Sequence, residues 1–211
     1  MNNQILIDNL IRDGYLKTPL IIEAFRKIDR ADFVPENLKN EAYVNAPLPI
    51  GFGQTISQPL TVAFMFELLQ PYPGDNLLDI GSGSGWTSAL AAYIVSSDKE
   101  KPGKVFSIEI ILDLYELGKI NIAKYNFIEK GIVKTFCIDG SKGLSQYAQF
   151  DKIIAGASGI KIPDSWKEQL KIGGRIIAPV EGSIWVLNKI EKNKFIEKEY
   201  PGFAFVPLIE K

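Results

Sequence analysis

The sequence contains no histidine among its 211 residues. This absence excludes Ser-His-Asp and Cys-His nucleophile systems, a histidine general base and histidine metal ligands. A single cysteine, Cys137, excludes an intrachain disulfide and any multi-cysteine metal site. We expect Cys137 to lie in the core of an apolar strand, no metal to be bound, and no side chain to titrate near pH 6.5.

The sequence also lacks a charge imbalance, a basic tract and a long apolar run. Lysine and arginine number 24 against 25 for aspartate and glutamate. No apolar run reaches about 18 residues, and residues 1–14 do not have the layout of a signal peptide. We therefore expect a cytoplasmic protein that binds neither nucleic acid nor membrane. With 46% hydrophobic residues, the chain can bury one sizeable core, which favours a single domain over 1–211.

The most informative segment reads LLDIGSGSGW and covers Leu77–Trp86. Three glycines, Gly81, Gly83 and Gly85, occupy alternate positions between an apolar strand and a helix that begins near Trp86. Glycine lets the backbone approach a ligand closely, because no Cβ stands in the way. The pattern predicts a cleft for a nucleotide-type cofactor.

The residues around the glycines indicate which cofactor. A dinucleotide-binding turn needs a third glycine where this chain has Trp86. Asp79 would repel a pyrophosphate, but it suits a ligand with a cationic amino or sulfonium group. The next two predicted strands end at Glu109, which can accept hydrogen bonds from ribose hydroxyls, and at Asp139, a partner for an adenine amine, with Gly140 behind it. The sequence therefore predicts S-adenosyl-L-methionine as the cofactor.

Apolar segments and turn residues give the order of elements. Strands are expected near 76–80, 104–109, 132–138, 151–156 and 174–180, alternating with helices near 85–96, 111–126 and 163–171. Helices are also expected before Gly14, from Pro19 and from Pro59, with irregular chain over 35–59 and further strands from Ser183 to Leu208. The alternation predicts an α/β fold, a doubly wound and mostly parallel Rossmann-like sheet with N-terminal helices and a C-terminal β extension. We divide the domain into 1–58, 59–180 and 181–211.

A second informative segment, PLPIGFGQTISQP, covers Pro47–Pro59 and carries no charged residue. Gly51 and Gly53 permit close backbone approach, and the polar side chains offer neutral hydrogen-bond donors. Such a loop can lie over a cofactor and bind a substrate carboxylate. Alternatively, Ser57 caps the helix entered at Pro59. Methyl transfer to a carboxylate suits a chain without histidine, since a carboxylate with a pKa near 4 is already ionised at neutral pH.

Six segments together resemble one known family, the protein-L-isoaspartate O-methyltransferases, a family of class I S-adenosylmethionine-dependent methyltransferases. They are RADFVPE (30–36), AYVNAPLPIG (42–51), LLDIGSGSGW (77–86), FDKIIAGA (150–157), LKIGGRIIAPV (170–180) and FVPL (205–208). The resemblance implies methylation of the free carboxylate of L-isoaspartyl residues in damaged proteins and peptides, followed by spontaneous closure of the ester to a succinimide. It implies isoaspartyl proteins as partners, and we expect a monomer.

The resemblance also implies site residues. It gives Ser57 the role of the active-site serine. The cofactor-binding residues we expect are Asp79, Gly81, Ser82, Gly83, Gly85, Glu109, Ile110, Asp139 and Gly140, and the residues expected to line the isoaspartyl groove are Thr55, Ile56, Pro179 and Val180.

The chain departs from the family pattern after the fourth strand of the core. It reads Gly156-Ala157-Ser158-Gly159-Ile160 where the family commonly has Thr-Ala-Ala-Pro-Pro, so we expect a more flexible wall of the site. Two alternatives therefore stay open. One is a methyltransferase of the same fold with a different small-molecule or peptide acceptor, and the other is a non-catalytic S-adenosylmethionine-binding protein.

Overall fold

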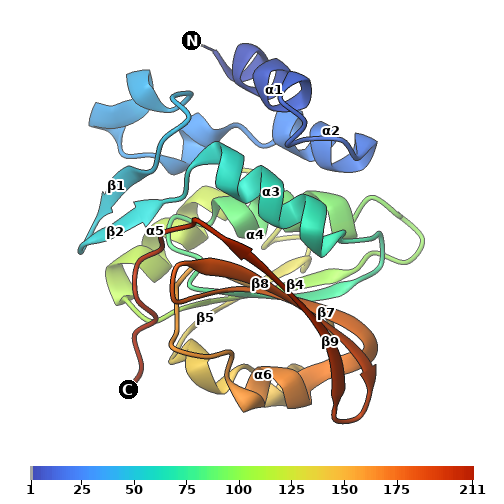
Figure 1. Ribbon diagram of the computed structural model, residues 1–211. Helices are drawn as coiled ribbons and strands as arrows, with labels where there is room; N and C mark the ends of the chain where they lie inside the picture. Colours follow the sequence, from blue (N-terminus) through green and yellow to red (C-terminus); the bar gives the residue numbers. More distant parts are fainter. Residues whose placement is uncertain (1) are drawn as a thin grey trace.

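The computed structural model describes residues 2–211, which form a seven-stranded sheet between two helical layers (Figure 1). The α-helices are α1 (Asn3–Arg12), α2 (Pro19–Lys27), α3 (Pro59–Leu69), α4 (Trp86–Val95), α5 (Leu112–Ala123) and α6 (Asp164–Gln169). The strands are β1 (Leu48–Gly51), β2 (Gln54–Ile56), β3 (Asn76–Ile80), β4 (Lys104–Glu109), β5 (Val133–Cys137), β6 (Phe150–Ala155), β7 (Leu170–Val180), β8 (Ser183–Glu191) and β9 (Lys194–Pro201). Short 3₁₀ helices are η1 (Arg30–Phe33), η2 (Glu36–Glu41), η3 (Gly140–Lys142) and η4 (Ser145–Tyr147).

The sheet has the order β5-β4-β3-β6-β7-β8-β9. Neighbouring strands are parallel from β5 to β7, whereas β8 and β9 add antiparallel to the edge. The predicted α/β fold with a mostly parallel sheet is confirmed. The chain order reverses between β3 and β6, and in such sheets ligands bind outside the carboxyl ends of the strands at this reversal.

The two faces of β3 show why this strand is almost wholly buried. Leu77 packs into the core shared with α1 to α5, and Leu78 and Ile80 pack into the core shared with α6. Figure 1 shows α1 to α5 above the sheet and α6 below it. A strand covered on both sides reads as a continuous apolar run, which is how the sequence presents it.

The segment predicted to be irregular contains a hairpin of β1 and β2, paired antiparallel. Its turn places Gly51, Phe52 and Gly53 at positive φ, of 96°, 53° and 71°. Among residues 2–211, nothing lies within 4 Å of a Cβ added at either glycine. Both glycines are therefore needed for the left-handed turn, and their close approach to a ligand stays a prediction. Strands of three and four residues are too short to show an alternating pattern.

Two further expectations from the sequence are wrong. Cys137 is exposed, because it is the last residue of the edge strand β5 rather than a core position. The C-terminal strands end at Pro201, and within residues 2–211 the chain beyond them forms no further strand; its β pairing is a single parallel bridge between Ser158 and Pro207. Over residues 2–211, no helix combines the length and apolar character needed to cross a membrane.

Candidate active site

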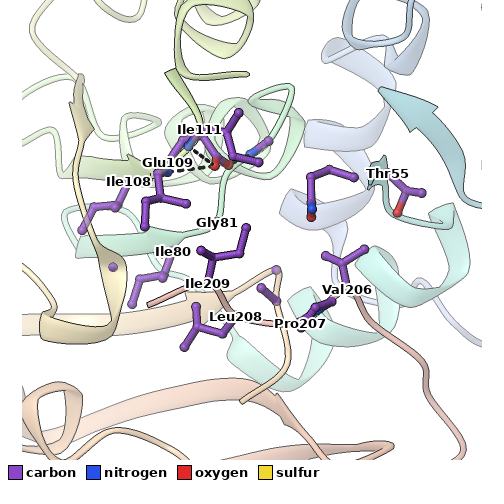
Figure 2. Close-up of a pocket in the computed structure, with 16 residues that line it drawn as sticks. Thr55, Ile80, Gly81, Ile108, Glu109, Ile111, Val206, Pro207, Leu208 and Ile209 are labelled. Atoms are coloured by element: carbon purple, nitrogen blue, oxygen red, sulfur yellow. Dashed lines mark hydrogen bonds between the residues drawn. The ribbon is translucent and has the colours of Figure 1, made fainter. Parts of the chain in front are cut away.

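A small cavity lies at the carboxyl ends of β3, β4 and β6, where the order of the sheet reverses (Figure 2). We call it the sheet-edge cavity; its volume is about 50 Å³. It is lined by Gln54, Thr55, Ile80, Gly81, Gly83, Ile108, Glu109, Ile110, Ile111, Gly140, Gly156, Ala157 and the C-terminal residues Val206, Pro207, Leu208 and Ile209. Five predicted cofactor residues therefore meet here: Gly81, Gly83, Glu109, Ile110 and Gly140.

The three glycines of the turn have different roles. Gly81 and Gly83 line the cavity with φ of 72° and 53°, and a Cβ at Gly83 would lie 3.1 Å from Ile50 Cδ1. Gly85 is the N-cap of α4 with φ 89°, and its Cβ would lie 2.9 Å from the Gly118 carbonyl oxygen on α5. Gly85 therefore permits the close packing of two helices and, within the described residues, does not line the cavity. The adjacent Ser82 lines a neighbouring, smaller cavity.

Glu109 is buried, with 6% of its surface exposed, and its carboxylate accepts hydrogen bonds from three backbone N–H groups. Oε2 accepts from Gly83 N at 2.9 Å, and Oε1 accepts from Ile110 N at 2.8 Å and Ile111 N at 3.0 Å (Figure 2). A carboxylate offers about four lone-pair sites, so one remains free. Glu109 thus fastens the glycine turn to β4 and keeps room for one further donor rather than two.

Asp79 lies behind the turn rather than in the cavity lining of the described chain. Its Oδ2 accepts hydrogen bonds from Thr87 Oγ1 at 2.7 Å and Ser88 Oγ at 2.6 Å, at the first turns of α4. Burial raises the pKa of Asp79 to about 6; the two hydroxyls oppose this shift and the nearby charge of Glu109 adds to it. The expectation that no side chain titrates near pH 6.5 is therefore wrong. In this structure, Asp79 positions the start of α4.

We expect Asp79→Asn to change how stability depends on pH. A folded pKa of about 6 against an unfolded value near 3.8 means that the folded state binds more protons between these values. The wild-type protein should therefore lose about 2 kcal/mol of unfolding free energy through Asp79 as pH rises from 4 to 7. In the asparagine variant, the side-chain oxygen can still accept a hydrogen bond from the Thr87 or Ser88 hydroxyl, but the side chain does not ionise, so this loss of stability should disappear. Urea unfolding at several pH values measures the difference, and parallel pH profiles for the two proteins would contradict it.

Asp139 is held by main-chain contacts beside the sheet-edge cavity. Its Oδ1 accepts a hydrogen bond from Ser141 N at 2.9 Å, and Oδ2 accepts one from Lys211 N at 3.0 Å. Burial alone would raise its pKa, but these hydrogen bonds and the charge of Lys142 outweigh burial and hold the pKa below its ordinary value. Asp139 lines a neighbouring cavity together with Ile110.

A larger groove of about 570 Å³ adjoins the sheet-edge cavity at three residues that line both, Thr55, Gly156 and Val206. We call it the Ser57 groove. It is lined by Tyr15, Pro47, Thr55, Ser57, Gln58, Leu60, Thr61, Gly156 and Gly202, Phe203, Ala204, Phe205 and Val206. The sequence predicted that the Pro47–Pro59 loop contributes to this groove. It did not predict Tyr15 or residues 202–204, which are distant from the loop in the sequence.

Ser57 does not cap α3. The N-cap is Gln58, and its side chain makes no capping hydrogen bond within residues 2–211. In the described structure, the Ser57 hydroxyl has no hydrogen-bond partner, whereas its backbone carbonyl accepts one from Arg30. The helix-cap alternative is therefore wrong, and the hydroxyl is free to donate into the groove.

The other predicted groove residues lie elsewhere. Ile56 is buried and lines the smaller cavity next to the glycine turn. Pro179 accepts a hydrogen bond from Gly159 N at 3.3 Å, and Val180 lines a separate cavity with Trp185. Neither residue belongs to the described lining of the Ser57 groove, because both lie at the end of β7, where this strand pairs with β8.

Gly156 lies where the two cavities meet, and a close backbone contact explains its identity. A Cβ there would lie 2.7 Å from the Gly81 carbonyl oxygen, and Gly156 N donates to the Ile80 carbonyl at 2.8 Å. Because glycine has no Cβ, the end of β6 can lie close to the backbone of the glycine turn.

Comparisons with known proteins agree on one family. The family model described as protein-L-isoaspartate(D-aspartate) O-methyltransferase matches residues 1–211. The chain is 39% identical over 208 residues to the protein-L-isoaspartate O-methyltransferase of Methanopyrus kandleri, covering 97% of this chain and 89% of the relative. It is 40% identical over 210 residues to that of Ignicoccus hospitalis, covering 98% and 96%.

Two solved structures share the fold. A Plasmodium falciparum structure containing S-adenosyl-L-homocysteine matches with a TM-score of 0.90 and 23% identity, covering 100% of both chains. A structure named protein-L-isoaspartate O-methyltransferase matches with a TM-score of 0.85 and 24% identity, covering 97% of this chain and 65% of the other.

Proposed function

The chain belongs to the protein-L-isoaspartate(D-aspartate) O-methyltransferase family, and we propose that it methylates the free carboxylate of L-isoaspartyl residues in proteins and peptides, with S-adenosyl-L-methionine as methyl donor. One observation carries the proposal beyond family membership. The uncharged Ser57 groove adjoins the sheet-edge cavity and shares Thr55, Gly156 and Val206 with it. A peptide carboxylate in the groove therefore lies next to the glycine turn.

The apolar walls and the free acceptor site of the sheet-edge cavity suit the cofactor. Ile80, Ile108 and Ile110 form apolar walls for a flat base, and Glu109 retains one acceptor site for a ribose hydroxyl. When bound, S-adenosyl-L-methionine supplies an electrophilic methyl group on a sulfonium. The sheet-edge cavity, of about 50 Å³, is smaller than the roughly 300–1,000 Å³ of ordinary ligand sites, and the adjoining cavities that Ser82 and Asp139 line extend it.

Gly83→Val should weaken binding of S-adenosyl-L-homocysteine by about 10-fold or more. A branched side chain at this cavity-lining residue would crowd Ile50, whose Cδ1 lies 3.1 Å from the added Cβ, and would strain a left-handed residue by about 1–2 kcal/mol. Gly173→Val is the matched control: Gly173 also has positive φ, 84°, and nothing in the described structure lies within 4 Å of its added Cβ. Calorimetry should show normal affinity for the control. Equal affinity for Gly83→Val and wild type would contradict the placement of the cofactor.

The groove explains how the chain works without a general base. An isoaspartyl carboxylate has a pKa near 4 and arrives ionised, so no proton has to be removed before it reacts. Ser57 has a free hydroxyl to orient it. No Asp, Glu, Lys or Arg occurs from Pro47 to Pro59, so the loop offers no cation to hold the carboxylate in its ground state. The contribution of the protein is positioning and exclusion of water.

Product analysis tests the proposal. Incubation of an isoaspartyl peptide with the protein and S-adenosyl-L-methionine should give a methyl ester that releases methanol in mild base and closes to a succinimide. Mass spectrometry distinguishes the ester from the succinimide. An unmodified peptide, with cofactor binding intact, would contradict carboxyl methylation and favour a different acceptor.

A further inference from the structure

Arg30 is a buried cation whose hydrogen bonds all reach the chain that precedes α3. Only 1% of its surface is exposed, in η1. Its Nη1 donates to the carbonyls of Ala42 at 2.7 Å and Val44 at 3.3 Å. Its Nη2 donates to the carbonyls of Ala46 at 3.0 Å and Ser57 at 3.2 Å. One guanidinium therefore ties together backbone groups that are up to 15 residues apart.

The guanidinium also contacts the other side of the site. Its central carbon lies 5.5 Å from the ring centre of Trp86, the first residue of α4 and the residue directly after the glycine turn. Burial lowers the pKa of Arg30 to about 10, so the side chain stays charged at neutral pH. A charged donor in an apolar setting makes strong hydrogen bonds, and its planar shape fixes their directions.

Other hydrogen bonds join residues 42–46 to Asp29, through Tyr43, and to the residues that follow Ser57. Asn45 Oδ1 accepts a hydrogen bond from Leu60 N at 3.0 Å, and Gln58 Nε2 donates to the Asn45 carbonyl at 3.0 Å. Residues 42–46 are therefore hydrogen-bonded to the start of α3. The Arg30 guanidinium bonds both to the carbonyls of this segment and to the Ser57 carbonyl. Arg30 itself does not line the groove within the described chain.

We propose that Arg30 is a positioning residue for methyl transfer, which holds the Ser57 backbone in register with the glycine turn. The inference rests on the proposed function for the meaning of Ser57. Its effect is exerted through the main chain of the loop, since the guanidinium contacts carbonyls and the Trp86 ring. Removal of the Arg30 guanidinium should therefore displace Ser57 and the methyl-accepting carboxylate while leaving the cofactor-binding residues in place.

Lys189 provides a matched control for the removal of a buried cation. It is 4% exposed and donates to the carbonyls of Lys167 and Leu170, both at 2.7 Å. Leu170 pairs with Phe150, the first residue of β6, whereas the site lies at the last residues of that strand. Lys189→Met should lower the melting temperature without changing the kinetics of the folded protein.

The experiment compares Arg30→Met, Arg30→Lys and Lys189→Met. Methionine keeps apolar contact with Trp86 but leaves the four carbonyls without their donor. We expect Arg30→Met to lower kcat/KM for an isoaspartyl peptide by about 10- to 100-fold, mainly in kcat, with affinity for S-adenosyl-L-homocysteine changed by less than about 3-fold. Arg30→Lys should recover part of the loss, because an ammonium reaches fewer of the carbonyls.

Hydrogen exchange gives a readout that does not depend on catalysis. Residues 42–58 should exchange faster in both Arg30 variants, and residues 81–86 should not. Normal kcat/KM in Arg30→Lys, or a parallel fall in activity and cofactor affinity, would overturn the proposal. If Arg30→Met does not fold, the same measurements on Arg30→Lys, compared with wild type and Lys189→Met, test the proposal. An inactive wild-type protein would count against the proposed function alone, while exchange at residues 42–58 would still decide the role of Arg30 as a clamp.

Discussion

Glu109→Ala should weaken binding of S-adenosyl-L-homocysteine by about 10- to 100-fold, the range expected for loss of a hydrogen bond to a charged group, and should destabilise the fold as well. The carboxylate has one acceptor site left for a ribose hydroxyl and uses the others for Gly83, Ile110 and Ile111. Alanine removes the ligand contact and also releases the glycine turn. Calorimetry with S-adenosyl-L-homocysteine measures the first effect.

Chemical denaturation measures the second effect of this substitution. Each backbone N–H left buried without an acceptor costs about 1–3 kcal/mol, reduced where the loop can admit water. Glu116→Ala, which removes an exposed acid on α5, should change neither property. Wild-type cofactor affinity in Glu109→Ala would refute the contact with the ribose, and wild-type stability would refute the fastening of the turn.

Ser57→Ala should lower kcat/KM for an isoaspartyl peptide by about 10-fold or more. A hydrogen bond from a hydroxyl to a charged carboxylate contributes about 1.5–3 kcal/mol, and no charged residue of the loop can replace it. The melting temperature should stay close to wild type, because Ser57 caps no helix and its hydroxyl has no partner among residues 2–211. Steady-state kinetics with peptide and cofactor varied separately measure the loss.

Two measurements control for this substitution. Affinity for S-adenosyl-L-homocysteine should be unchanged, since Ser57 does not line the sheet-edge cavity in the described structure. Ser145→Ala, at an exposed serine of η4, should leave the kinetics unaltered. Normal efficiency in Ser57→Ala would remove the hydroxyl from the reaction.

The core of the fold is predictable from the sequence because buried parallel strands are nearly continuous apolar runs. β3 and β4 match their predicted bounds, and the glycine turn follows β3 as expected. The hairpin of β1 and β2 could not be predicted, because strands of three or four residues with a glycine-rich turn give no periodic signal. The exposure of Cys137 depends on β5 being an edge strand, which is a property of sheet order rather than of local sequence.

The site was predictable in position but not in detail. Gly81, Gly83, Glu109 and Gly140 line one cavity as a strand-end pattern suggests. The main-chain bonds of Glu109 and the burial of Asp79 arise from contacts between strands and helices, which composition does not reveal. Arg30 lies in a segment that carries the family resemblance, but its burial could not be predicted, since an arginine beside Asp29 and near Asp32 normally lies at the surface.

Radiolabelled methyl transfer to two peptides that differ only in one linkage tests the central claim most directly. An L-isoaspartyl peptide and its normal aspartyl twin are each incubated with the wild-type protein and S-adenosyl-L-methionine carrying a tritiated methyl group. We expect label in the isoaspartyl peptide alone, released as methanol in mild base. Equal labelling of both peptides, or base-stable label, would contradict it.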